Sequence, residues 1–163
     1  PLMERTGHSP IKEKMKEIKS PLSGEMSGHV CYGDDFYGYD DAMYVGLRLL
    51  RILGNKNKNL NDIIDKYPKT FSTPETRFDV DEIKKFKIID EIKERLLSFE
   101  GNIIDIDGIR VETEEGWFLM RASNTQNQLT CRVESTSKNG LKKLIDIVEN
   151  QLQLSNVNFK FTI

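Results

Sequence analysis

The sequence is poor in the residues that build disulfide frameworks and zinc sites. Its 163 residues include only two cysteines and two histidines. Two cysteines are too few for a disulfide framework and indicate a reducing, cytoplasmic setting. His8 and His29 show no Cys/His ligand spacing, so the pattern predicts no zinc or other metal site in this chain.

Strong charge of one sign and long apolar segments are missing as well. The chain has 24 basic and 26 acidic residues and a formal net charge of −2, which disfavours a strongly basic nucleic-acid-binding surface. No apolar run approaches the ~20 residues that a membrane helix needs, and residues 1–5 lack the apolar stretch of a signal peptide. With 37% hydrophobic and 31% charged residues, the composition is typical of a globular protein with one ordinary domain or two small ones.

The first third of the chain is predicted to form helices joined by glycine-rich loops. Apolar residues spaced three and four positions apart among lysines and glutamates predict a short amphipathic helix over 11–18. A second helix is predicted over 42–53. Asp40 and Asp41 precede it, where carboxylates stabilise a helix start, and Gly54 is expected to end it.

Several polar or reactive residues are predicted to have structural roles and not catalytic or metal-binding ones. Cys31 and Cys131 are predicted to be small buried hydrophobic residues. The aspartates of the first region lack the spacing of a calcium loop, which favours helix capping over a cation site: Asp34, Asp35, Asp40 and Asp41.

Residues 55–76 are typical of a linker. An Asn-Lys-Asn-Lys-Asn run is followed by a short helical piece over 60–67, and then by Pro68 and Pro74. Because prolines and small polar residues punctuate this stretch, we place the domain boundary here.

The second region alternates between strand and helix patterns. Strand patterns begin at residue 77 and recur between residues 103 and 134, with a hairpin turn at Asp107-Gly108. Helices are predicted over 83–99, with Asp81 as N-cap, and over 138–152. We therefore expect the α+β class: a partial α/β domain, then a small domain with a four-stranded antiparallel sheet covered by two helices (β-α-β-β-β-α). The alternating residues 157–163 are a candidate additional strand.

A glycine-flanked loop at residues 24–29 carries a carboxylate, a hydroxyl and an imidazole just before a candidate strand over 29–32. Glu25 and Ser27 stand at i and i+2 of an extended loop, so both can point to the same side. That arrangement suits hydrogen bonding to adjacent hydroxyls of a sugar, and glycines let a backbone approach a ligand closely. The alternative is a surface loop whose glycines serve turns and whose His29 packs locally.

A second polar group follows a predicted strand at Arg121, Ser123, Asn124 and Thr125. A guanidinium, two hydroxyls, an amide and successive backbone N–H groups are what a phosphate dianion requires. The alternative is a strand end with ordinary polar turn residues.

The two loops, in this order, resemble a known family. Residues 6–12 (Thr-Gly-His-Ser-Pro-Ile-Lys), 24–29 and 37–42 resemble the third domain of bacterial phosphomannomutase/phosphoglucomutase, of the α-D-phosphohexomutase family. Residues 107–111 and 116–125 resemble its fourth domain, so the likeness covers nearly the whole chain. Met26 and the Ala-Ser-Asn wording after Arg121 resemble the mannose/glucose branch.

The resemblance implies a domain organisation and a reaction. Residues 1–54 would be the C-terminal part of domain 3, 55–76 a linker or hinge, and 77–163 domain 4. The family interconverts hexose 6-phosphate and hexose 1-phosphate through a bisphosphate, using a phosphoserine and Mg²⁺ held by aspartates. Neither motif occurs in this chain, which is therefore expected to be an inactive C-terminal fragment of a cytoplasmic enzyme whose partners are a hexose phosphate and the missing N-terminal domains.

The resemblance also assigns roles to residues. Glu25 and Ser27 would hold the sugar hydroxyls, His8 would be a polar or proton-handling group near the reacting end, and His29 would support the sugar loop. The phosphate that is not transferred would be held by four residues: Arg121, Ser123, Asn124 and Thr125. Gln126 and Asn127 replace the usual Thr-Pro, a difference expected to change the rigidity of the loop and its affinity for phosphate.

Two alternative functions, from other functional classes than an enzyme fragment, are left open by the sequence. One is a non-catalytic phosphosugar-binding module, distinguished by binding without turnover. The other is a nucleic-acid-binding antiparallel sheet, which the acidic pI near 5.8 disfavours.

Overall fold

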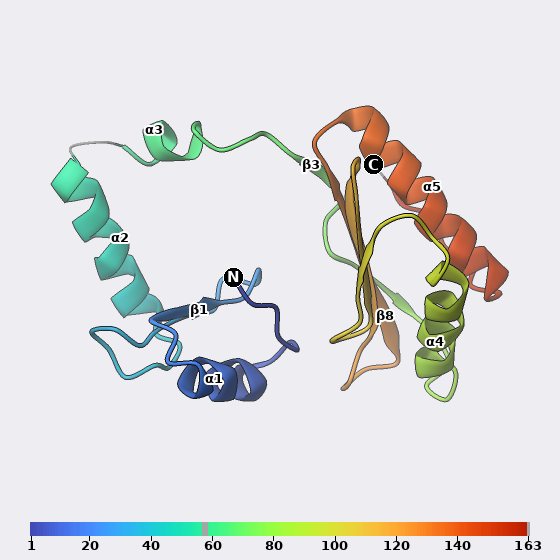
Figure 1. Ribbon diagram of the computed structural model, residues 1–163, viewed down its shortest axis with the longest axis horizontal. Coiled ribbons are helices and arrows are strands. Elements are labelled where there is room, and N and C mark those ends of the chain that lie inside the picture. The colour runs from blue at the N-terminus through green and yellow to red at the C-terminus, as the bar shows by residue number, and fades with distance from the viewer. Residues whose placement is uncertain (57–58, 163) are drawn as a thin grey trace. The chain divides into compact units, whose positions relative to one another are not determined.

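The computed structural model describes residues 1–56 and 59–162. The chain divides into two compact units, which we call unit 1 (Pro1–Tyr67) and unit 2 (Pro68–Ile163). Figure 1 labels the elements along the chain. None of the helices in the described ranges is long and apolar enough to cross a membrane. Unit 1 contains three helices and a two-stranded hairpin: α1 His8–Glu17, β1 Leu22–Gly24, β2 Val30–Tyr32, α2 Ala42–Lys56 and α3 Leu60–Ile64.

Unit 1 has a small interior. Met15 of α1 and Cys31 of β2 are its buried hydrophobic residues, and the Ser23 hydroxyl of β1 lies 3.3 Å from the Met15 sulfur. The described part of the unit therefore gains little from apolar burial.

Helix α2 starts as predicted but ends later. Asp41 Oδ1 accepts a hydrogen bond of 2.9 Å from Tyr44 N, so the predicted capping role is confirmed for this aspartate. The helix continues through Gly54 to Lys56, because a glycine inside a helix costs only about 1 kcal/mol. Its apolar stripe lies in the open, since Met43 is 81% and Leu50 65% exposed.

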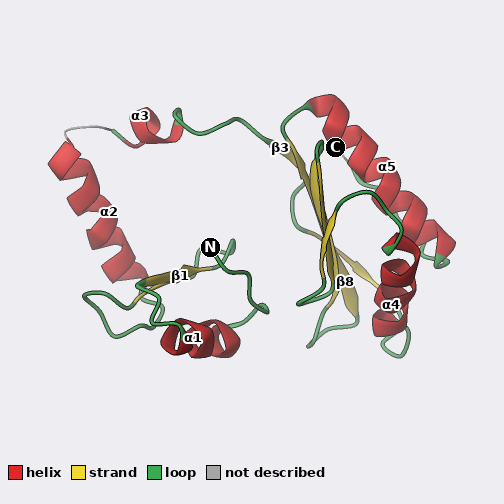
Figure 2. Ribbon diagram, viewed as in Figure 1, coloured by secondary structure: helices red, strands yellow, loops and turns green. Residues whose placement is uncertain are grey.

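Unit 2 is an antiparallel sheet covered on one face by two helices (Figure 2). The strand order is β3-β8-β7-β6-β5, and β4 also pairs with β8. The predicted class and the two covering helices are confirmed, but the sheet has six strands instead of four. Its elements are β3 Phe71–Ser72, β4 Thr76–Asp79, α4 Lys85–Leu96, β5 Asn102–Ile104, β6 Ile109–Thr113, β7 Gly116–Ala122, β8 Gln128–Ser135 and α5 Lys138–Leu154.

The core of unit 2 lies between the sheet and the helices. Alternate residues of the central strands, such as Val111, Phe118 and Val133, are fully buried, as are Ile92 of α4 and Val148 of α5. Such alternation is expected of a sheet with one covered face.

The two cysteines are buried and unpaired with each other, as predicted. Burial raises the pKa of the Cys131 thiol, which keeps it protonated and unreactive.

Two predictions for unit 2 were wrong in detail. Helix α4 begins at Lys85, because Asp81 Oδ1 accepts from Ile83 N and turns the chain before the helix. Ile83 is consequently 89% exposed. Within the described residues, 157–162 form no strand; Phe159 instead stacks on Phe78 with ring centroids 4.3 Å apart, and Ile163 lies outside the described residues.

Candidate functional site

The first polar loop is the turn of the β1–β2 hairpin. Glu25 N donates to His29 O at 2.8 Å and Gly28 N to Glu25 O at 3.0 Å, so the turn is closed by its own backbone. Gly28 has φ 95°, a value that an L side chain adopts only with strain. Ser27 is exposed at the tip.

Glu25 connects this loop to the start of α1. Its Oε1 accepts a hydrogen bond of 3.0 Å from Gly7 N, the residue that precedes the helix. A carboxylate at a helix N-terminus is stabilised by the helix dipole and the unsatisfied N–H groups. One contact thus fixes Glu25 and brings the segment that carries His8 to the hairpin turn.

His29, predicted to support the loop, is hydrogen-bonded to the carboxylate of Asp40, whose predicted role is helix capping. Its Nδ1 hydrogen-bonds to Asp40 Oδ2, and Asp40 Oδ1 also accepts from Val30 N at 3.3 Å. The bond to His29 is the largest cause that lowers the pKa of Asp40. Because the ionised carboxylate can only accept, Nδ1 carries the proton and Nε2 is directed elsewhere.

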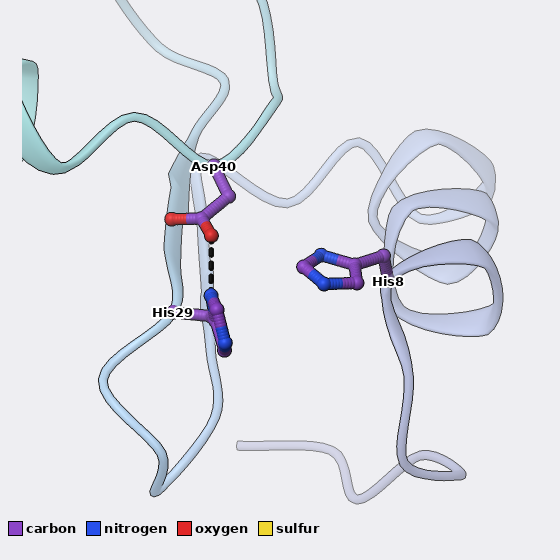
Figure 3. A group of neighbouring side chains, drawn as sticks. All are labelled: His8, His29 and Asp40. Atoms are coloured by element: carbon purple, nitrogen blue, oxygen red, sulfur yellow. Dashed lines mark hydrogen bonds and ion pairs between the residues drawn. The ribbon is translucent and has the colours of Figure 1, made fainter. Parts of the chain in front are cut away.

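His8 lies beside this pair, as Figure 3 shows. The rings of His8 and His29 are 4.9 Å apart between centroids and meet edge to face. One ligand atom from each of His8, His29 and Asp40 can be chosen so that all lie within 4.8 Å of one another. The residues come from three separate segments, so sequence spacing carried no sign of the group.

The second polar loop follows β7 in unit 2. Arg121, on β7, forms an ion pair of 3.5 Å with Asp107 from the β5–β6 turn, and its side chain is only 17% exposed. Gly108 makes this approach possible, because a Cβ there would lie 2.4 Å from Met120 O. The Asp107-Gly108 turn, predicted only as a hairpin, therefore also orients the guanidinium.

The loop after Arg121 is closed by Ser123. Its hydroxyl oxygen accepts hydrogen bonds from Gln126 N at 3.1 Å and Thr125 N at 3.4 Å, and Ser123 N donates to Gln128 O at 2.9 Å. The backbone N–H groups of this loop are predicted to face a phosphate, but those of Thr125 and Gln126 donate to the Ser123 hydroxyl. Asn124 and Thr125 are exposed at the tip.

Lys85 is a residue that sequence reasoning missed. It is 4% exposed, and its Nζ donates to Gln126 O at 2.9 Å. A buried ammonium is costly unless hydrogen-bonded, so its position ties the start of α4 to the polar loop. Val80 N also donates to Asn127 O at 2.9 Å. A charged residue at the N-terminal end of an amphipathic pattern gives no sequence signal of burial.

Both parts of the chain match models of known protein domains. Residues 1–71 match the family model for phosphoglucomutase/phosphomannomutase, alpha/beta/alpha domain III, and residues 75–151 match that for the C-terminal domain. The chain is 41% identical over 153 residues to the phosphomannomutase/phosphoglucomutase of Pseudomonas aeruginosa, covering 94% of this chain and 33% of that protein. It is 40% identical over 146 residues to a phosphoglucomutase of Neisseria gonorrhoeae, covering 88% of this chain and 31% of that protein.

A solved structure supports the same assignment. A phosphoglucomutase/phosphomannomutase family protein of Burkholderia thailandensis superposes with a TM-score of 0.85 at 37% identity, over 98% of this chain and 34% of that one. The chain thus spans about a third of the length of these relatives. On these matches, it belongs to the phosphoglucomutase/phosphomannomutase family.

Proposed function

We propose that each unit of the chain has its own half-site for part of a hexose phosphate. The loop at residues 121–125 holds the phosphate and the loop at 24–29 holds sugar hydroxyls. In the whole protein, these half-sites serve the interconversion of mannose or glucose 6-phosphate and 1-phosphate through a bisphosphate. The names of the relatives, phosphomannomutase/phosphoglucomutase and phosphoglucomutase, support this reaction class.

The observation that carries the proposal is the oriented guanidinium of Arg121 next to a closed turn. Asp107 holds Arg121 from one side, and Ser123 holds the turn that follows. A largely buried arginine forms stronger charge-assisted hydrogen bonds with phosphate than an exposed one, and its planar fork matches two phosphate oxygens. Asn124 and Thr125 add exposed amide and hydroxyl groups at the tip of the same turn.

The sugar half-site supplies hydroxyl partners and a proton-handling group. Glu25 accepts hydrogen bonds and Ser27 can donate or accept, which matches the two-way hydrogen bonding of sugar hydroxyls. We assign the proton-handling role to His29, whereas the resemblance gave it to His8. Its tautomer is fixed by Asp40, and a histidine oriented by a carboxylate is suited to accept and return a proton.

Mg²⁺, which the resemblance assigns to the full-length protein, does not fit Asp34, Asp40 and Asp41 of unit 1. Mg²⁺ requires oxygen ligands in near-octahedral geometry. Asp34 pairs with Arg48 at 2.7 Å, Asp40 with His29, and Asp41 caps α2. The proposal therefore uses no metal ion in this chain. It retains residues 1–54 as part of domain 3 and 77–163 as domain 4, while residues 68–76 of the predicted linker 55–76 lie in unit 2.

A titration of the chain with glucose 1-phosphate and mannose 1-phosphate, followed by backbone NMR shifts, tests the proposal. We expect shifts at residues 121–125 and at 24–29. Arg121→Gln should weaken binding at least tenfold, because it removes the charge that contacts the phosphate.

Arg110→Gln is the matched control, since Arg110 lies on the neighbouring strand with a similar side-chain exposure of 18%. It should bind within twofold of the unsubstituted chain. Equal affinity of the two variants, or no shift at residues 121–125, would refute the phosphate half-site. Binding without turnover in the whole protein would favour the non-catalytic module.

A further inference from the structure

The group formed by His8, His29 and Asp40 has a second chemical capacity. His8 is the first residue of α1, His29 directly precedes β2, and Asp40 lies just before α2. Figure 3 shows the imidazole of His8 pointing toward the His29–Asp40 pair. Two imidazole nitrogens and one carboxylate oxygen can therefore approach one point from three segments of the same unit.

This donor set suits a transition metal. Imidazole and carboxylate ligands bind Zn²⁺ at about 2.0–2.2 Å, so tetrahedral ligand atoms lie roughly 3.3 Å apart. The chosen ligand atoms lie within 4.8 Å of one another, and the His29 and Asp40 atoms are already in contact. Both histidines are exposed, so rotation of the His8 side chain can close the remaining gap without disturbing a core.

We propose that His8, His29 and Asp40 form a binding site for a divalent transition metal, with Zn²⁺ as its representative. On binding, the ion takes the place of the proton on His29 Nδ1, this proton moves to Nε2 so that the ring stays a neutral imidazole, and His8 becomes the third ligand. A fourth position stays open to water or to an oxygen of a bound anion. The set contains one oxygen donor and two imidazoles, which favours Zn²⁺ over Mg²⁺.

Metal binding would compete with the sugar half-site. An ion on His29 Nδ1 leaves the ring proton on Nε2, which can then no longer accept a proton, and it fixes the end of the 24–29 loop. The metal site itself does not depend on the proposed function, because its ligands and their proximity are independent of any sugar.

The experiment is a calorimetric titration of the whole chain with zinc chloride in a non-coordinating buffer, with the histidine ring resonances followed by NMR. We expect one ion per chain, shifts of both His8 and His29, and no saturable response to magnesium chloride. Cobalt(II) should give a visible absorption band that excess Zn²⁺ removes. Absence of saturable Zn²⁺ binding would overturn the proposal.

Substitutions separate this site from other ways of binding zinc. His8→Gln should weaken Zn²⁺ binding at least tenfold, and so should His29→Gln. Asp35→Asn is the matched control, because Asp35 is an exposed carboxylate of the same unit that pairs with Arg48 instead; its affinity should stay within twofold. His8 is exposed, so the fold is expected to persist in His8→Gln, which far-UV circular dichroism checks. Unchanged affinity in His8→Gln would show that zinc binds elsewhere and that His29–Asp40 is only a proton-handling pair.

Discussion

At the scale of single residues, Lys85 anchors the loop that follows Arg121. Its buried ammonium donates to Gln126 O, the residue that replaces the usual Thr of the family motif. The cation also lies 5.2 Å from the ring of Phe86, a cation–π contact that offsets part of its desolvation. Lys85 thus provides a fixed anchor for this loop.

Lys85→Met should lower the free energy of unfolding of unit 2 by about 1–3 kcal/mol, because the carbonyl of Gln126 loses a charged partner. It should also weaken phosphate binding. Unfolding in urea can be followed through Trp117, the only tryptophan of the chain, which lies in unit 2. Lys87→Met is the control: this lysine is 76% exposed and its loss should change stability by less than about 0.5 kcal/mol. Equal stability of the two variants would contradict the anchoring role.

The contrast between predicted and missed residues has a physical cause. Arg121 and Ser123 are candidates from the sequence because their residue types, taken together in one short segment, already indicate an anion site. Lys85 and Asp107 reach the same loop from other elements, and Asp40 reaches His29 in the same way. Contacts between distant segments leave no periodicity or spacing in the sequence, so they could not be predicted.

At the scale of elements, strand β3 lies within residues 55–76, which the sequence predicts to be a linker. Phe71 and Ser72 pair with Ser135 and Glu134 of β8. Thr73 is 3% exposed and exchanges two hydrogen bonds with Val133. The C-terminal end of the predicted linker or hinge is therefore tied to the sheet of unit 2. A two-residue strand has no recognisable period, which is why the sequence pattern indicated only a linker.

Thr73→Val tests how firmly this element is held. The two side chains have nearly the same shape, but valine removes the hydroxyl oxygen that accepts from Val133 N at 3.1 Å. A buried N–H left without a partner costs about 1–3 kcal/mol, and we expect this loss in the urea unfolding of unit 2. Thr76→Val, whose hydroxyl donates to Pro74 O at an exposed position, should leave stability nearly unchanged. A Thr73→Val variant as stable as the unsubstituted chain would show that β3 is only loosely attached.

At the scale of the whole molecule, apolar burial is divided unequally between the units. The hydrophobic cluster of the chain joins residues of α4, β6, β7, β8 and α5, all in unit 2. Unit 1 buries Met15 and Cys31. Because apolar burial supplies most of the stability of a fold, the two units should differ in how often they open.

Amide hydrogen exchange in the intact chain measures this difference. We expect the amides of β7 and β8 to exchange only through global unfolding of unit 2, and those of α2 to exchange with little protection. Helix α5, with 17 residues, is the matched reference for α2, with 15: both are long and amphipathic, but α5 buries its apolar face in the core of unit 2, whereas the apolar stripe of α2 is exposed. An isolated helix of this length is marginally stable in water, and the stripe at Met43, Leu47 and Leu50 is exposed. Protection of α2 equal to that of α5 would mean that another surface covers this stripe in solution, and self-association measured by sedimentation would then identify a second copy of the chain as its partner.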